Sequence, residues 1–84
     1  MALPKKIQYR LIKTKEYVED SGTVTAYGIC CREDHQTREQ RRVQYRIIPN
    51  ISTEPEFVEE LIDKLIRNDA DPVHLRELIE DYLP

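Results

Sequence analysis

The strongest constraint on the fold is a change in the spacing of apolar residues near residue 50. Before that point apolar and polar residues alternate, as in Ile7 to Leu11 and Val43 to Ile47, which is typical of half-buried β-strands. After it, apolar residues recur at helical spacing across 57–66. The charge changes at the same place: residues 1–49 carry ten Lys or Arg and six Asp or Glu, whereas residues 50–84 carry three and ten. These patterns predict a cationic sheet followed by two anionic helices.

The punctuation of the chain sets the expected limits of these elements. We expect strands at about residues 6–17, 23–32 and 42–48, and helices at about residues 54–67 and 72–83. Asp20, Ser21 and Gly22 predict a tight turn, because glycine readily adopts positive φ. Residues 32–42 contain no apolar side chain, which predicts a mobile, solvated hairpin arm. Pro49 is expected to end the third strand, because proline has no N–H to donate to a ladder.

Three further positions carry local signals. Gly28 lies inside the second predicted strand and indicates a bulge or a close approach by another segment. Thr53 followed by Glu56 predicts a capping box at the start of the first helix. Asp71 before a proline predicts an N-cap for the second helix.

The expected architecture is one α+β domain that spans residues 1–84. A short connection makes the two helices an αα-hairpin, and a three-stranded antiparallel meander needs one face covered to be stable. The hairpin supplies that cover. The prediction is therefore a βββαα two-layer sandwich, with one face of the sheet left open.

Several short stretches also resemble a known family. They are the run from Thr25 to Ile29, Ile51-Ser52 ahead of a helix, His74-Leu75, and the C-terminal run from Leu78 to Leu83. Together they look like a family of short uncharacterised proteins from Gram-positive bacteria. The resemblance implies no activity, cofactor or functional residue.

The residues that could carry chemistry form no recognisable site. Cys30 and Cys31 are neighbours, so on a strand they point to opposite faces and lack the spacing of a structural zinc site. We expect both to be reduced thiols, with one in the core and one near the surface. His35 and His74 are interpreted as surface residues. We therefore predict no catalytic, metal or cofactor-binding residues, and we expect that the protein is not an enzyme.

The sheet face opposite the helices is the candidate interaction surface. If Ile7, Tyr9, Leu11, Val43, Tyr45 and Ile47 face the helices, the alternate residues form the other face. The residues predicted there are Arg10, Ile12, Arg42, Gln44, Arg46 and Ile48, joined by Tyr27 or Ile29. Apolar side chains among arginines are typical of protein interfaces, although arginine stems can also simply cover isoleucines on a solvated sheet.

Two functions are compatible with such a face. The first is a small, non-catalytic protein-interaction module that binds a protein partner or forms a homodimer. The alternative is weak binding of single-stranded nucleic acid by the basic strands and the 32–42 arm, which a sequence pI of about 5.4 disfavours. We expect no small-molecule ligand. The N-terminus predicts no secretory signal and no apolar run is long enough for a membrane span, so we expect a cytoplasmic protein.

Overall fold

The computed structural model describes residues 6–20 and 22–83 and shows the α+β fold that the sequence predicts. Its elements are β1 (Lys6–Val18), β2 (Gly22–Gln36), β3 (Arg41–Ser52), α1 (Pro55–Arg67), the 3₁₀ turn η1 (Pro72–His74) and α2 (Leu75–Tyr82). The expectation of no secretory signal concerns the N-terminal segment, most of which lies outside the described residues. Ser21 of the predicted turn also lies outside them.

The three strands form an antiparallel meander in the order β1-β2-β3. Gly22 has a φ of 74°, which agrees with the turn predicted before the second strand. The hairpin between β2 and β3 closes at Thr37 and Gln40, where the Thr37 N–H donates to the Gln40 carbonyl at 2.7 Å. β2 is therefore the central strand, and β1 and β3 are its neighbours on either side.

The prediction of a mobile arm at residues 32–42 is wrong. Glu33 to Gln36 pair with Arg41 to Gln44 across the ladder, so only residues 37–40 form the connection. Backbone hydrogen bonds and charge pairs hold this part of the hairpin, and neither leaves an apolar signature in the sequence. The strands are therefore longer than predicted.

β3 continues past Pro49, contrary to the prediction that the proline ends it. The register with β2 shifts between Tyr27 and Ile29, and Asn50 on β3 has a φ of 54°. A bulge of this kind accommodates a residue without an N–H. Gly28 lies at the same point, where a Cβ atom would stand 2.9 Å from the Cα of Pro49. The signal for a bulge or a close approach at Gly28 is thus confirmed.

The helix starts differ in how well they were predicted. The capping box from Thr53 to Glu56 is wrong: Glu54 is the N-cap, and its N–H donates to the Ser52 hydroxyl at 3.0 Å. Asp71 does act as a cap, with its carboxylate accepting the Val73 N–H at 3.0 Å. It caps a short 3₁₀ turn that leads into α2.

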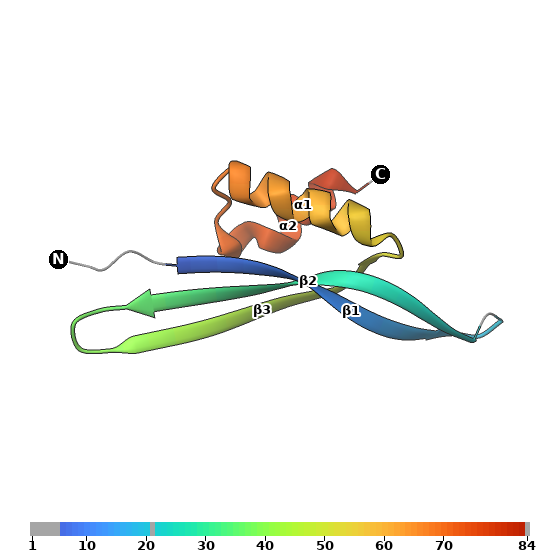
Figure 1. The fold of residues 1–84 in the computed structure, drawn as a ribbon, viewed down its shortest axis with the longest axis horizontal. Coiled ribbons are helices and arrows are strands. Elements are labelled where there is room, and N and C mark those ends of the chain that lie inside the picture. The colour runs from blue at the N-terminus through green and yellow to red at the C-terminus, as the bar shows by residue number, and fades with distance from the viewer. Residues whose placement is uncertain (1–5, 21, 84) are drawn as a thin grey trace.

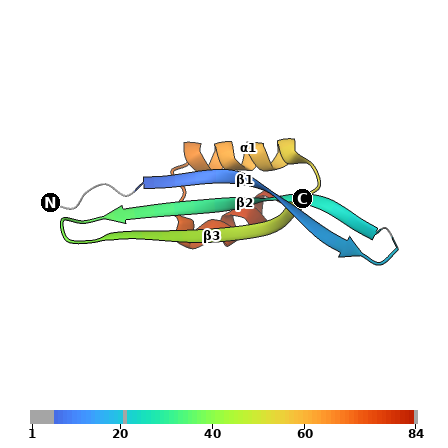
Figure 2. The ribbon, with the colours of Figure 1, turned by 60° about the horizontal axis from the view of Figure 1, so that its bottom comes forward.

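Both helices lie on the same side of the sheet, above its middle part (Figure 1). The core that they close contains buried side chains from β2, α1 and α2. Its fully buried apolar members are Ile29, Cys31, Val58, Leu61, Leu65, Leu75 and Ile79. No helix lies on the opposite face of the sheet, which stays open among the described residues (Figures 1 and 2).

The molecule is elongated, because both hairpins project beyond the helical layer (Figure 2). Its principal extents are 55 × 23 × 18 Å, and its radius of gyration is 15.0 Å. A compact chain of this length would have a radius of gyration of about 12 Å. The fold therefore exposes more sheet surface than a chain of this size usually does.

Candidate interaction face

Alternation along β2 fixes which side chains face the helices. Ile29, Cys31 and Glu33 are buried, whereas Cys30 and Arg32 between them are only partly covered. Since successive side chains on a strand point to opposite faces, the odd-numbered residues of this stretch lie against the helices. The even-numbered residues lie on the uncovered face.

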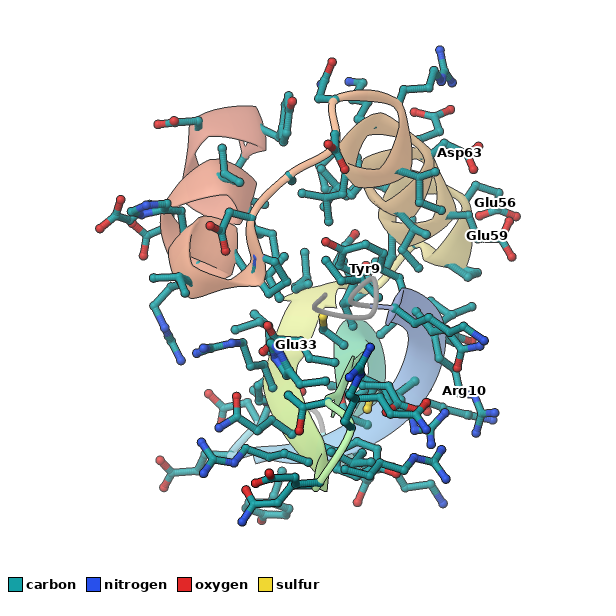
Figure 3. The ribbon with its side chains drawn as sticks, turned by 90° about the vertical axis from the view of Figure 1, so that its left-hand side faces the viewer. Tyr9, Arg10, Glu33, Glu56, Glu59 and Asp63 are labelled. Carbon is teal, nitrogen blue, oxygen red and sulfur yellow. The ribbon has the colours of Figure 1, made fainter. Side chains whose placement is uncertain are left out.

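The register then places the residues of β1. Leu11 pairs with Ile29 and Tyr9 with Cys31, so both face the helices, as predicted. Arg10 pairs with Cys30 and therefore lies on the uncovered face. Figure 3 shows Tyr9 between the sheet and the helices, and Arg10 away from them.

The predicted faces of β3 are reversed in the structure. Ile47 pairs with Cys30 and Tyr45 with Arg32, which puts both on the uncovered face, where Ile47 is 57% exposed and Tyr45 62%. Ile48 instead pairs with Ile29 and packs against the core. The sequence signal was ambiguous, because the strand ends in two adjacent isoleucines and either phase therefore carries apolar side chains.

The eight residues predicted for the interaction surface consequently do not share one face. Arg10 and Ile12 lie on the uncovered face as expected. The other six, Tyr27, Ile29, Arg42, Gln44, Arg46 and Ile48, belong to the helix side of the ladder. Ile29 is fully buried and has no surface to offer a partner. The prediction that those six residues belong to the interaction surface is therefore wrong.

We define the open face by the residues that the ladder places on the uncovered side of the sheet. Around the middle of β2 and towards the β2–β3 connection they are Lys6, Gln8, Arg10, Ile12, Cys30, Arg32, Asp34, Gln36, Arg41, Val43, Tyr45 and Ile47. Its β3 row is apolar and solvent-exposed, and Tyr45 lies beside a shallow hollow that Gln8, Arg10, Cys30 and Arg32 complete. The β3 row of the open face is thus more apolar than predicted, because Val43, Tyr45 and Ile47 replace Gln44, Arg46 and Ile48.

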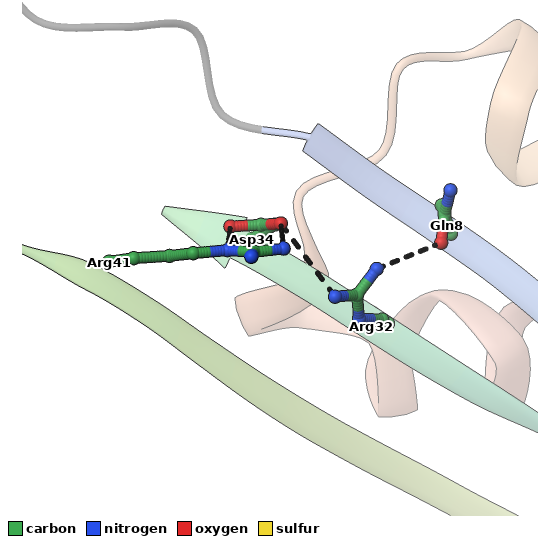
Figure 4. Close-up of polar contacts among 4 residues, drawn as sticks. All are labelled: Gln8, Arg32, Asp34 and Arg41. Carbon is green, nitrogen blue, oxygen red and sulfur yellow. Dashed lines mark hydrogen bonds and ion pairs between the residues drawn. The ribbon is translucent and has the colours of Figure 1, made fainter. Parts of the chain in front are cut away.

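Charge pairs organise the end of the open face near the β2–β3 connection. Arg41 contacts Asp34 with two nitrogens, Nη2 at 2.8 Å and Nε at 3.2 Å (Figure 4). Arg32 lies 3.8 Å from the same carboxylate and donates to Gln8 at 3.4 Å. The hydrogen bond from Arg41 lowers the pKa of Asp34 and raises that of Arg41. Asp34 therefore balances one of the positive charges at this end within the sheet.

A second charged group lies on the helix side. Glu33 is almost fully buried, with Arg46 Nε 3.0 Å and His35 Nε2 3.6 Å from its carboxylate oxygens. A buried carboxylate needs such partners. Nearby, burial followed by the charges around it raises the pKa of Tyr9 to about 12, and its hydroxyl donates to the Ala70 carbonyl at 3.4 Å. The Tyr9 contact therefore joins the sheet to the helical layer, and the Glu33 contacts join residues within the sheet.

The adjacent cysteines follow the alternation that the sequence predicts. Cys31 is buried in the core and Cys30 is partly exposed on the open face, and neither forms a disulfide. In residues 6–20 and 22–83 no three His, Cys, Asp or Glu side chains are grouped so that they could hold a metal ion. Within the same described part of the chain, no helix has the length and apolar character needed to cross a membrane.

Comparison with known proteins gives one match. A model for a family of unknown function, DUF6514, matches residues 3–84, nearly the whole chain. No curated protein and no solved structure matches it.

Proposed function

We propose that this chain, which belongs to the family of unknown function DUF6514, is a small non-catalytic protein-interaction module that binds its partner through the open face and β3. The observation that carries the proposal is the exposed apolar row of Val43, Tyr45 and Ile47 on a face that the helices leave uncovered. Burying apolar surface contributes about 25 cal/mol per Å². A partner whose side chains pack against this row would therefore gain affinity.

The composition of the face supports a protein partner. Tyr and Arg are enriched among the residues that dominate binding energy, and Tyr45 lies among Arg10 and Arg32. Arg41, at the end of the row nearest the β2–β3 connection, is already paired with Asp34, so its positive charge is compensated within the molecule. A second copy is the simplest partner, because a two-fold contact uses the same patch on both molecules.

Two placements support a non-catalytic role. Cys30 and His35 belong to opposite faces of β2, so they do not form a nucleophile and base pair. His35 and His74 each lie near a carboxylate instead, at 3.6 Å from Glu33 and 3.7 Å from Glu77. Assays for hydrolase activity with a Cys30→Ser control test this point, and turnover that the substitution abolishes would contradict it.

Light scattering over a concentration series tests the interaction. Ile47 on the open face and Ile66 on α1 make a matched pair, since they are the same residue type and are 57% and 59% exposed. We expect the parent protein to associate, Ile47→Glu to abolish association and Ile66→Glu to leave it intact. A parent that stays monomeric at every concentration, or equal effects of the two substitutions, would contradict self-association through this face.

A second candidate function is binding of single-stranded nucleic acid. The favouring observation is Tyr45, exposed beside two arginines, because aromatic side chains among cations can stack on bases. The formal net charge of −3 weighs against it. A mobility shift that weakens with salt and disappears in Tyr45→Ala would support this function, and no binding at low salt would remove it.

We also infer a cytoplasmic location and an origin in Gram-positive bacteria. The first rests on two cysteines that form no disulfide, which suits a reducing compartment. The second rests on the resemblance of the short sequence stretches described above. Thiol labelling in intact cells tests the location, and quantitative oxidation of Cys30 there would contradict it.

A further inference from the structure

The outer edge of β3 presents backbone groups as well as side chains. The hydrogen bond between Thr37 and Gln40 sets the phase of the β2–β3 ladder, because bonded and non-bonded pairs alternate. Gln44 and Arg46 therefore bond to β2. The N–H and C=O groups of Val43, Tyr45 and Ile47 point outward, since β3 is at the edge of the sheet formed by the described residues.

A groove runs along this edge. Arg46, Ile47 and Ile48 form one wall, and residues of η1 and α2, including Val73 and Glu77, form the other. Figure 3, viewed nearly along the strands, shows α2 above and outside β3. Val73 is 63% exposed here. An added strand would therefore bond to the edge and lie partly under the helical layer.

The other edge of the sheet is protected in a way that β3 is not. β1 carries exposed Lys6, Lys13 and Lys15, and lysines on an edge strand disfavour pairing with another chain. β3 has no lysine, and two of its arginines are paired within the molecule, Arg41 with Asp34 and Arg46 with Glu33. The available edge is therefore that of β3.

We propose, on the basis of the function proposed above, that the occupant of this edge is β3 of a second copy, antiparallel and centred on a two-fold axis at Tyr45. The two meanders then form one continuous sheet. On its open side Tyr45 lies opposite Tyr45 of the second copy, and Val43 of each copy lies opposite Ile47 of the other. Cross-strand pairs of aromatic and β-branched residues stabilise such ladders.

The arginines disfavour the two neighbouring registers. In the joined sheet, open-face residues of one copy must lie opposite open-face residues of the other, because a slip of one residue would turn the side chains of one strand to the other face. Centring the pair on Gln44 would place Arg42 opposite Arg46, and centring it on Arg46 would place that residue opposite itself. Like charges directly opposite are destabilising. Centred on Tyr45, the strand sets Arg46 opposite Gln44 and Arg42 opposite Ile48, in the groove that both Arg76 and Glu77 line.

Stacking two open faces on each other is the less favourable arrangement. It would remove Arg10, Arg32 and the Arg41–Asp34 pair of both copies from water, and desolvating charges is costly. It would also leave the outward backbone groups of β3 without strand partners. Edge pairing meets neither difficulty, because the charged part of each open face stays in solvent.

Disulfide trapping tests the register. In a Cys30→Ser background, which removes the native thiol of the open face, Tyr45→Cys places two cysteines opposite each other across the axis. Their Cα atoms would be about 5.5 Å apart, within disulfide range. Val43→Cys is the matched control, because its copies would be separated by four residues along the strand, about 13 Å.

We expect a covalent dimer on a non-reducing gel for Tyr45→Cys and none for Val43→Cys alone. Mixing Val43→Cys with Ile47→Cys should restore a covalent dimer. Light scattering is measured on the same reduced samples. If the protein associates but Tyr45→Cys is trapped no better than Val43→Cys, the register is wrong while self-association stands. If the reduced samples are monomeric throughout, self-association itself is overturned.

Discussion

Truncating two isoleucines that lie on opposite faces of the sheet gives contrasting stability changes. Ile29 has 0% of its surface exposed and belongs to the core beneath the helices, whereas Ile47 is 57% exposed. Ile→Ala at a buried site costs about 2–5 kcal/mol through lost transfer energy and the cavity left behind. Full burial places Ile29→Ala near the middle of that range, at about 3–4 kcal/mol. Ile47→Ala should change the free energy of unfolding by no more than about 0.5 kcal/mol.

Urea unfolding followed by circular dichroism measures both changes. The protein concentration must be low enough for light scattering to show a monomer, because association would add to the apparent stability of the parent. In a thermal melt the loss at Ile29 corresponds to about 12–32 °C in Tm. Both substitutions remove the same atoms, so differences in side-chain chemistry cancel. Equal losses at the two positions would refute the assignment of faces to β2 and β3.

Three further changes test other contacts of the fold. Gly28→Ala should destabilise the protein by about 3 kcal/mol in a thermal melt, because its Cβ would meet the β3 backbone at Ile48; an unchanged Tm would contradict this close approach. Arg46→Met should cost about 1–3 kcal/mol in urea unfolding by removing the guanidinium that lies 3.0 Å from the Glu33 carboxylate, and adding Glu33→Gln should recover most of it. The pKa of Tyr9, about 12 in the folded state against 10.0 ordinarily, means that stability is full below pH 10 and falls as the pH rises towards 12. Tyr9→Phe should reduce that decline, and a phenolate titration that shows all tyrosines near pH 10 would contradict it.

The order of elements was predictable because each has a local signal. Alternation around Tyr9 predicts β1, helical spacing around Leu61 predicts α1, and Gly22 and Asp71 mark a turn and a cap. These signals depend only on neighbouring residues in the sequence, so they can be recognised without knowledge of the fold. The number and order of strands and the helical cover followed from them.

The faces of β3 and the extent of its hairpin were not predictable in the same way. Glu33 reads as a solvated residue in a polar stretch, but the ladder buries it and Arg46 lies beside it. That ion pair joins two residues thirteen positions apart in the sequence and has no local signature. Ile47 and Ile48 are adjacent, so the pattern alone does not decide which one meets the core. The candidate surface therefore required the register of the sheet, which places Ile47 and its neighbours on the open face.

Hydrogen exchange of the β3 amides at two protein concentrations tests the central claim most directly. The amides of Gln44 and Arg46 bond to β2 and should exchange slowly at both concentrations, whereas those of Tyr45 and Ile47 point outward. If β3 pairs with a second copy, the amides of Tyr45 and Ile47 become protected only at the higher concentration. Exchange that stays equally fast at both concentrations, in a sample that light scattering shows to be associated, would contradict pairing along β3.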